Sequence, residues 1–184
     1  MEIESYFGYF REIPQIDFPQ LEKIAQELVT AIRNEKSIFL IGNGGSAGTV
    51  EHFETDLSFI KESRDLPKVK VFALTANSSL ISALANDIGF ENVFLHQLKR
   101  KASKNDVCFL ISASGNSNNL IQAAHWSKQH GIKTVALLGF DGGQLSNLVE
   151  DCYIVKTEIG KYGNVEDLHL AICHSLSARI KELI

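Results

Sequence analysis

The stretch from Ser37 to Leu57, SIFLIGNGGSAGTVEHFETDL, constrains the fold more than any other part of the chain. It begins with a short apolar run over 37–41, rich in β-branched and aromatic residues, which predicts a buried strand. A glycine-rich turn from Gly42 to Ser46 follows at once. Ser46 then stands at the N-cap position of a predicted helix over 47–57. A strand, a tight turn and a helix start in this order direct unpaired backbone N–H groups at one point, which favours binding of an anion such as phosphate.

The glycine turn alone does not decide between a ligand site and a merely tight turn. It is neither the Gly-x-Gly-x-x-Gly pattern of dinucleotide-binding folds nor a P-loop, because no Lys-Ser or Lys-Thr pair follows it. Both interpretations stay open until other parts of the chain are considered.

Strand-like and helix-like segments alternate along the whole chain. Apolar runs predict strands over 37–41, 69–74, 106–111, 134–138 and 152–155, and periodic segments between and around them predict helices. Among these, a short helix capped by residues 77–79 should run to Leu84 and be broken by Asn86-Asp87, and the last helix should span about 165–184. This alternation predicts an α/β fold: a five-stranded parallel sheet covered on both faces, hence a three-layer α/β/α sandwich. A length of 184 residues without a long linker predicts one domain over 1–184.

The N-terminal part is expected to pack against another subunit. Residues 1–10 are aromatic and loosely amphipathic, and a helix this short and apolar is marginal by itself. A second helix over 18–34 carries one apolar face. The prediction is that the N-terminal helices, about 1–35, lie at a subunit interface.

Composition excludes several classes of protein. The net charge of −4 and the lack of a Lys/Arg-rich run argue against direct nucleic-acid binding. The three cysteines form no Cys-x-x-Cys motif and lie in apolar contexts, which predicts free thiols and a reducing, cytoplasmic environment. No segment resembles a signal peptide or reaches membrane-spanning length, so no membrane association is expected.

A second loop strengthens the ligand interpretation. The hydroxyl-rich segment from Ser112 to Ser117, SASGNS, directly follows the predicted strand over 106–111. In an open parallel sheet, loops at the carboxyl ends of strands lie along one edge, where ligands bind. The glycine turn and this loop should therefore face one phosphorylated small molecule. The alternative is that Ser112, Ser114 and Ser117 are ordinary turn and capping residues.

Candidate chemical groups lie on two predicted helices. His52 and Asp56 are four residues apart and share a helix face, which makes a plausible but weak half-site for zinc. In the last helix, Glu166 and His174 are eight residues apart and lie on roughly the same side, whereas His169 is rotated away from them. A single helical histidine is more often structural than a ligand, and spacing alone does not establish that the two helices meet.

Taken together, these motifs resemble the sugar isomerase (SIS) domain, and within that family most closely the phosphoheptose isomerases. The motifs are Gly42-Asn43-Gly44-Gly45-Ser46, His52-Phe53-x-x-Asp56, Ala85-Asn86-Asp87, Ser112-x-Ser114-Gly115-Asn116-Ser117, Asp141-Gly142-Gly143 and His169 with His174. The resemblance covers nearly the whole chain in order. It implies a flavodoxin-like SIS fold and a homotetramer whose active sites are built between subunits. It also implies conversion of sedoheptulose 7-phosphate to glycero-manno-heptose 7-phosphate.

The resemblance also assigns roles to individual positions. Positions matching residues that bind the sugar phosphate are Asn43, Gly44, Gly45, Ser46, Asn86, Asp87, Ser112, Ala113, Ser114 and Ser117. His52 and His174 match zinc ligands, and His174 also matches the catalytic histidine. Four residues depart from the family pattern: Asp56 replaces the glutamate that binds metal and abstracts a proton, Glu166 replaces a substrate-binding glutamine, Gly163 an aspartate and Ala113 a threonine. The expected ligands of one zinc ion per subunit are His52, Asp56, Glu166 and His174.

The expected reaction is aldose–ketose isomerisation through an enediol. A carboxylate base, Asp56 or Glu166, removes the proton beside the carbonyl, His174 acts as the acid, and zinc polarises the oxygens. The choice between the two carboxylates stays open. Two alternatives remain: a non-catalytic regulator of the replication-initiator-binding type, and an isomerase of another sugar phosphate, which the changes at Asp56, Gly163 and Glu166 would favour.

Overall fold

The computed structural model describes residues 6, 8, 16–60 and 68–184. Its strands are β1 (Ser37–Gly42), β2 (Lys70–Ala73), β3 (Val107–Ser112), β4 (Lys133–Gly139) and β5 (Asp151–Val155). All pairings are parallel, and the strand order is β2-β1-β3-β4-β5. This is the doubly wound order of flavodoxin-like folds. The predicted five-stranded parallel sheet is confirmed.

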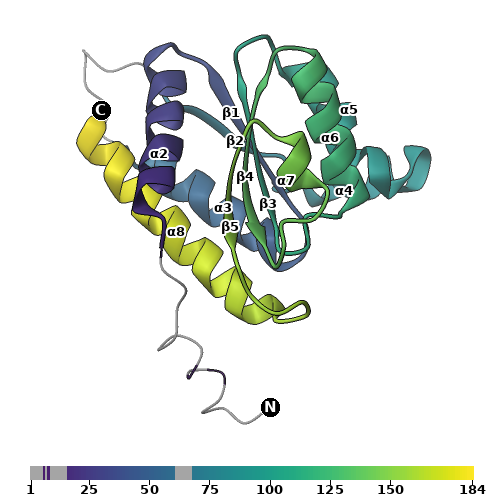
Figure 1. Cartoon of the computed structure of the whole chain (residues 1–184). Coiled ribbons are helices and arrows are strands. Elements are labelled where there is room, and N and C mark those ends of the chain that lie inside the picture. The colour runs from purple at the N-terminus through teal and green to yellow at the C-terminus, as the bar shows by residue number, and fades with distance from the viewer. Residues whose placement is uncertain (1–5, 7, 9–15, 61–67) are drawn as a thin grey trace.

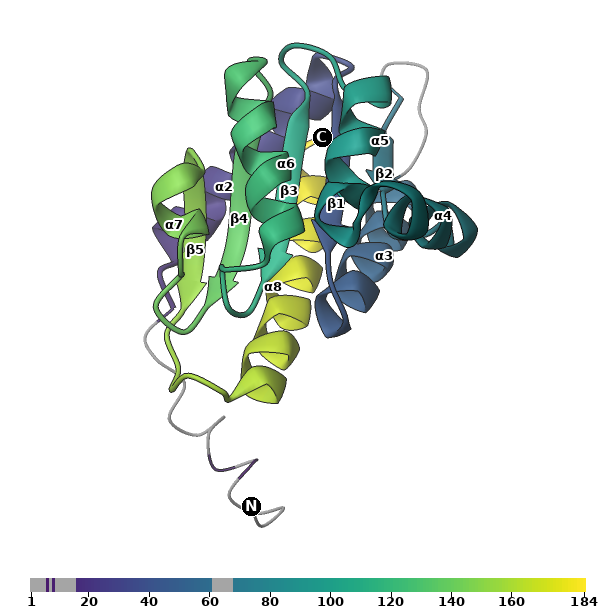
Figure 2. The same ribbon diagram turned by 90° about the vertical axis from the view of Figure 1, so that its right-hand side faces the viewer.

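Helices cover both faces of the sheet, as Figures 1 and 2 show. One face carries α2 (Phe18–Arg33), α3 (Gly45–Ser58) and α8 (Tyr162–Leu183). The other carries α4 (Ser78–Ile88), the 3₁₀ turn η2 (Phe90–Asn92), α5 (Val93–Lys101), α6 (Asn118–Gln129) and α7 (Leu145–Leu148). A separate apolar core lies on each side of the sheet. The molecule is therefore the predicted three-layer sandwich.

The burial of each strand follows from its place in the sheet. All six residues of the central strand β3 are buried, and β1 is buried from Ile38 onward. Strands covered on both faces read as continuous apolar runs, which is what the sequence shows here. In the edge strand β5, buried residues alternate with half-buried ones. The three cysteines are free thiols, as predicted.

Three predicted helix boundaries are wrong. Helix α4 continues through Asn86 and Asp87 and ends at Gly89, whose φ of +87° is a conformation that favours glycine. Asn and Asp cost a helix only a fraction of a kcal/mol, so the pair does not stop it. Helix α3 begins at Gly45 with Gly44 as its N-cap, so Ser46 is a buried first-turn residue and not the cap. Helix α8 begins at Tyr162, three residues before the predicted start.

Of the predicted helix over 1–10, only Tyr6 and Gly8 fall within the described residues, and both are helical. The remainder of that prediction lies outside the described part of the chain. Helix α2 is confirmed. Its cap is Asp17, whose carboxylate accepts a hydrogen bond from the backbone N–H of Gln20.

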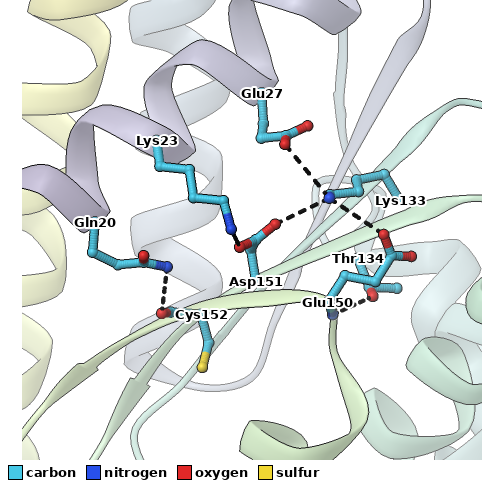
Figure 3. Close-up of polar contacts among 8 residues, drawn as sticks. All are labelled: Gln20, Lys23, Glu27, Lys133, Thr134, Glu150, Asp151 and Cys152. Carbon is cyan, nitrogen blue, oxygen red and sulfur yellow. Dashed lines mark hydrogen bonds and ion pairs between the residues drawn. The ribbon is translucent and has the colours of Figure 1, made fainter.

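A cluster of charged groups fastens α2 to the amino ends of β4 and β5 (Figure 3). The side chain of Asp151 is 5% exposed and pairs with both Lys23 and Lys133, the latter at 3.0 Å. Lys133 also lies 3.5 Å from Glu27 and 3.3 Å from Glu150. Burial alone would raise the pKa of Asp151, but hydrogen bonds from the two lysines lower it overall. The cluster lies at the amino ends of the strands, whereas the two ligand loops lie at the carboxyl ends. It therefore holds α2 in place and does not belong to the site.

Among the residues described, no helix combines the length and apolar character that crossing a lipid bilayer requires.

Candidate active site

The two loops predicted to share a ligand meet at the carboxyl edge of the sheet. They enclose a cavity of about 260 Å³ that also receives side chains from the first turns of α8. The residues lining it are Asn43, Gly44, Gly45, Ser46, Ile111, Ser112, Ala113, Ser114, Ser117, Tyr162 and Glu166. Eight of the ten positions predicted to bind the sugar phosphate, together with Glu166, thus lie around one pocket.

The serine hydroxyls in this pocket can still donate hydrogen bonds to a ligand. The Oγ of Ser112 accepts a hydrogen bond from the Gly115 N–H at 3.1 Å, and the Oγ of Ser114 accepts one from the Asn116 N–H at 3.2 Å. Both bonds use a lone pair and leave the hydroxyl hydrogen available. Ser117 occupies the N-cap position of α6 without forming a side-chain cap bond. Three hydroxyl donors at a helix start suit a phosphate group.

The serine loop is held in shape by the Asp141-Gly142-Gly143 turn. Gly115 has a φ of +62°, and a Cβ atom built there would lie 2.0 Å from the carbonyl oxygen of Gly142, so only glycine fits. The Gly115 carbonyl accepts a hydrogen bond from the Leu145 N–H at 3.0 Å. The side-chain oxygen of Asn116 accepts one from the Gln144 N–H at 3.0 Å. The segment after β4 thus holds the serine loop in its conformation through these two hydrogen bonds.

The glycine loop faces a carboxylate. A Cβ atom at Gly45 would lie 2.3 Å from Oε2 of Glu166, so the glutamate occupies the space that any side chain at position 45 would need. Gly45 is the first residue of α3, and a carboxylate is stabilised near the positive end of a helix. This negative charge would repel a phosphate in the glycine loop. The serine loop is therefore the better place for a phosphate than the glycine loop.

A second cluster joins α3 to α8, further along both helices. The Nε2 atoms of His52 and His174 lie 2.9 Å apart, within hydrogen-bond distance. Asp56 lies 3.7 Å from Nε2 of His52 and 3.9 Å from Nε2 of His174. Its Oδ2 lies 3.3 Å from the hydroxyl of Ser177, whose single hydrogen also faces the His174 carbonyl at 2.9 Å. We refer to His52, Asp56 and His174 as the histidine–aspartate group.

The histidine–aspartate group fits a divalent metal. Its three ligand atoms lie within 4.8 Å of one another. Two nitrogens bound tetrahedrally to one zinc at about 2.0–2.1 Å would be about 3.3 Å apart, close to the observed separation. Two imidazoles with one carboxylate form a mixed nitrogen and oxygen donor set, which zinc accepts. Each histidine side chain is 51% exposed, so the group is open to solvent on one side. Three protein ligands with one open position are typical of catalytic zinc sites.

The comparisons with known proteins identify the family. The model of the SIS domain matches residues 7–139. A phosphoheptose isomerase from a Nitratiruptor species is 38% identical over 84% of this chain and 81% of its own length. The phosphoheptose isomerase of Aquifex aeolicus is 32% identical over 99% of this chain and 97% of its own. The chain belongs to the SIS-domain family, among the phosphoheptose isomerases.

Solved structures of this family agree with the fold. The phosphoheptose isomerase from Neisseria gonorrhoeae superimposes with a TM-score of 0.86 at 25% identity, over 97% of this chain and 94% of that one. The one from Francisella tularensis gives a TM-score of 0.84 at 26% identity, over the same shares. The predicted SIS fold and enzyme class are confirmed.

Asn86 and Asp87 fall outside both clusters, and Glu166 belongs to the pocket alone. Asn86 and Asp87 are exposed on α4, where the Nδ2 of Asn86 donates to Oδ1 of Asp87 at 2.8 Å, and they do not line the pocket described above. Glu166 lies in the sugar pocket and is not a member of the histidine–aspartate group. It precedes His174 by about two helical turns, about 12 Å along α8. The predicted four-ligand set is thus seen as three ligands and one pocket residue.

The glycine at position 163 is covered by an N-terminal residue. A Cβ atom at Gly163 would lie 2.9 Å from the hydroxyl oxygen of Tyr6. That hydroxyl donates a hydrogen bond to Asp167 at 2.5 Å, which together with burial raises the pKa of Tyr6 to about 12. Tyr6 therefore contacts the first turns of α8, beside the pocket residues Tyr162 and Glu166.

Sequence reasoning missed residues that support the site. Asn119 is 2% exposed and exchanges two side-chain hydrogen bonds with Asn43, each of 2.9 Å. Tyr162 lines the pocket, and the Ser177 hydroxyl lies 3.3 Å from Asp56. The sequence feature that could have identified Asn119 is its position directly after the serine loop, at the start of a predicted helix. Its partner, 76 residues earlier, could not be read from spacing.

Proposed function

We propose that this chain is a zinc-dependent isomerase that converts sedoheptulose 7-phosphate to glycero-manno-heptose 7-phosphate. The observation that carries the proposal is that α8 supplies residues to both clusters. Glu166 reaches the pocket formed by the two loops, and His174 reaches the histidine–aspartate group. A substrate pocket and a metal group joined by one helix are what an aldose–ketose isomerisation with electrophilic assistance requires. The names of the relatives support the substrate.

The pocket suggests how the substrate is oriented. The phosphate binds the hydroxyls of Ser112, Ser114 and Ser117 at the start of α6, because the carboxylate of Glu166 disfavours an anion at the glycine loop. The sugar end then lies between the glycine loop and α8. Binding energy from the phosphate, which does not react, holds the carbonyl end in position for proton transfer.

We assign the proton transfer to Glu166. It lies among the pocket residues, takes the proton from the carbon next to the carbonyl, and returns it to the neighbouring carbon. His52, Asp56 and His174 would hold a zinc ion, which when bound would supply electrophilic assistance to the carbonyl and hydroxyl oxygens. Because this group lies about 12 Å along α8 from Glu166, the reacting carbons must lie between the two. His174, whose Nε2 lies beside that of His52, is also the acid that the family resemblance implies: it would carry the second proton from the hydroxyl to the carbonyl oxygen.

We further propose that the chain is a single SIS domain over 1–184, cytoplasmic, and a homotetramer with its N-terminal helices at a subunit interface. An apolar cavity of about 1070 Å³ between α2, β5 and α8 supports this, since it is larger than the sugar pocket yet holds none of its residues. Phe18 on α2 is 70% exposed beside it. Exposed aromatic residues of this size mark surfaces that bind other chains. Asn86 and Asp87, exposed on the projecting α4, would complete the pocket of a neighbouring subunit.

Two variants test the assignment of the carboxylates. Glu166→Gln should lower kcat by about 10²- to 10⁴-fold while zinc stays bound, because general base catalysis contributes this much. Asp56→Asn should lose zinc first. The matched control is Glu158→Gln, an exposed carboxylate of the β5–α8 loop, which should change neither quantity. Metal content by mass spectrometry and conversion of sedoheptulose 7-phosphate are measured together, and full turnover in Glu166→Gln would contradict the assignment.

A second candidate is an isomerase of another sugar phosphate. The carboxylate of Glu166 inside the pocket and the Tyr6 ring against Gly163 both change the surroundings of the sugar relative to the family pattern. A panel of ketose and aldose phosphates of five to seven carbons separates the two. The first proposal requires the highest kcat/KM for the heptose.

A further inference from the structure

We propose that Asn119 is a positioning residue: with Asn43 it forms an amide clasp that fixes the distance between the glycine loop and the serine loop. This inference rests on the proposed function, because its effect on ligands requires a substrate that spans both loops. Asn119 is the second residue of α6, and Asn43 follows β1 directly. The clasp therefore crosses between the segments that follow two neighbouring strands of the sheet.

The orientation of both amides is determined by the backbone. The N–H of Leu120 donates to Oδ1 of Asn119 at 3.0 Å, and a backbone N–H can only donate. Oδ1 of Asn119 therefore also accepts from Nδ2 of Asn43, and Nδ2 of Asn119 donates to Oδ1 of Asn43. Both reciprocal bonds are 2.9 Å long. The start of α6 thus fixes the orientation of the Asn119 amide, and Asn119 in turn fixes the orientation of the Asn43 amide.

Burial makes this arrangement costly to break. Asn119 is 2% exposed, and a buried amide that loses its partner costs more than the hydrogen bond itself contributes. Asn43 lines the pocket on the glycine side, whereas Ser117, two residues before Asn119, lines it on the serine side. Each Asn43 amide atom makes one bond in the clasp, so one N–H and one lone pair remain for the sugar.

The clasp matters because the substrate has two ends. A sugar phosphate held at both ends gains affinity only when the two half-sites stand at a fixed separation, since each end then pre-positions the other. Inorganic phosphate uses the serine loop alone. Loss of the clasp should therefore weaken binding of the sugar phosphate and leave binding of inorganic phosphate unaffected. A general loss of loop structure would weaken binding of both ligands.

The experiment compares two ligands in three variants. Asn119→Ala removes the clasp. Asn119→Ser also removes it but keeps a hydroxyl acceptor suited to a first helical turn, which protects the fold. Asn118→Ala, the exposed neighbouring residue, is the matched control. Isothermal titration should show binding of sedoheptulose 7-phosphate weakened about tenfold to a hundredfold in both Asn119 variants. Inorganic phosphate should stay within about twofold, and the control should bind both ligands normally.

A ligand-free measurement distinguishes failure of the clasp from failure of the proposed function. In NMR spectra of the unliganded protein, the side-chain N–H₂ of Asn43 should exchange with water at least about tenfold faster in Asn119→Ala than in the wild type or in Asn118→Ala. Unchanged exchange overturns the clasp, as does equal weakening of both ligands. A wild type that binds no sugar phosphate overturns the proposed function, and amide exchange then decides the clasp alone.

Discussion

Two clusters of ionisable side chains lie at different ends of this molecule, and they differ in what completes them. At the amino ends of β4 and β5, Asp151 is nearly buried and has Lys23 and Lys133 as partners (Figure 3). Between α3 and α8, Asp56 has only the two imidazoles of His52 and His174 beside it among the ion pairs of the described residues. The first cluster contains its own cations. The second offers two imidazoles and one carboxylate, a donor set that suits a divalent metal.

This difference separates a structural cluster from a functional one. Burying a charge is tolerated when oppositely charged groups surround it, as they do around Asp151. Burial alone would lower the pKa of Lys133, but the carboxylates of Asp151, Glu27 and Glu150 raise it overall. The histidine–aspartate group is partly exposed, and on our proposal a divalent cation completes it. Removing a residue from the first cluster should therefore cost stability, and removing one from the second should cost activity.

The largest effect is expected at the metal. His174→Ala should abolish zinc binding and lower turnover about 10³-fold, because electrophilic assistance from the metal is worth several kcal/mol. The free energy of unfolding of the metal-free protein should hardly change, since the side chain is half exposed. His125→Ala, an exposed histidine on α6, is the control and should keep both zinc and turnover. Zinc content and initial rates are measured on the same samples, and retention of both in His174→Ala would remove the metal site.

The opposite pattern is expected in the structural cluster. Asp151→Asn leaves two lysines without their buried carboxylate and should lower the free energy of unfolding by about 2 kcal/mol. Turnover per folded molecule should stay within about twofold. Urea denaturation followed by circular dichroism gives the first quantity. Glu150→Gln, whose side chain is 38% exposed, should cost clearly less. Equal costs for the two variants would contradict the role given to Asp151.

Protonation of His169 should make stability depend on pH. Burial lowers the pKa of His169 to about 4, against a partly opposing hydrogen bond with the Leu138 carbonyl. The unfolded state therefore binds the proton between about pH 6.5 and 4 while the folded state does not, so stability is lost as the pH falls through this window. From pH 7 to pH 5 the loss should be about 2 kcal/mol. Denaturation of His169→Asn should show a flatter pH dependence, and an unchanged slope would refute this source.

The smallest effect is expected in the phosphate loop. Ser114→Ala removes one of several donors and should weaken binding of the sugar phosphate about tenfold, with no loss of zinc. Titration calorimetry measures the affinity, and Asn118→Ala again serves as control. Since Ser114 also accepts from the Asn116 N–H, a small loss of stability is expected as well. Normal affinity in Ser114→Ala would place the phosphate elsewhere.

Most of the fold follows from the sequence because its patterns are local. Each strand of the sheet is an apolar run, and Gly42 to Ser46 and Ser112 to Ser117 each follow one. Parallel pairing then places both loops at one edge of the sheet without further information. The end of α4 differs from the prediction because Asn86-Asp87 is only a weak helix breaker. Gly89, with its positive φ, ends that helix instead.

The candidate site was less predictable because it depends on contacts between distant segments. Helical spacing brought His52 and Asp56 together, but only tertiary packing brings His174 to them from 122 residues away. Spacing also placed Glu166 and His174 on one side of a helix. It could not show that Glu166 fits against Gly45 while His174 faces His52. The amide clasp between Asn43 and Asn119 is of the same kind.

The most direct test of the central claim is one rate measurement. Conversion of sedoheptulose 7-phosphate to the aldose phosphate is followed by NMR with the purified protein, before and after removal of metal by a chelator, and again after zinc is restored. The proposal predicts conversion that falls at least about a hundredfold on chelation and recovers with one equivalent of zinc per chain. No conversion at all, or conversion that chelation leaves unchanged, would contradict it.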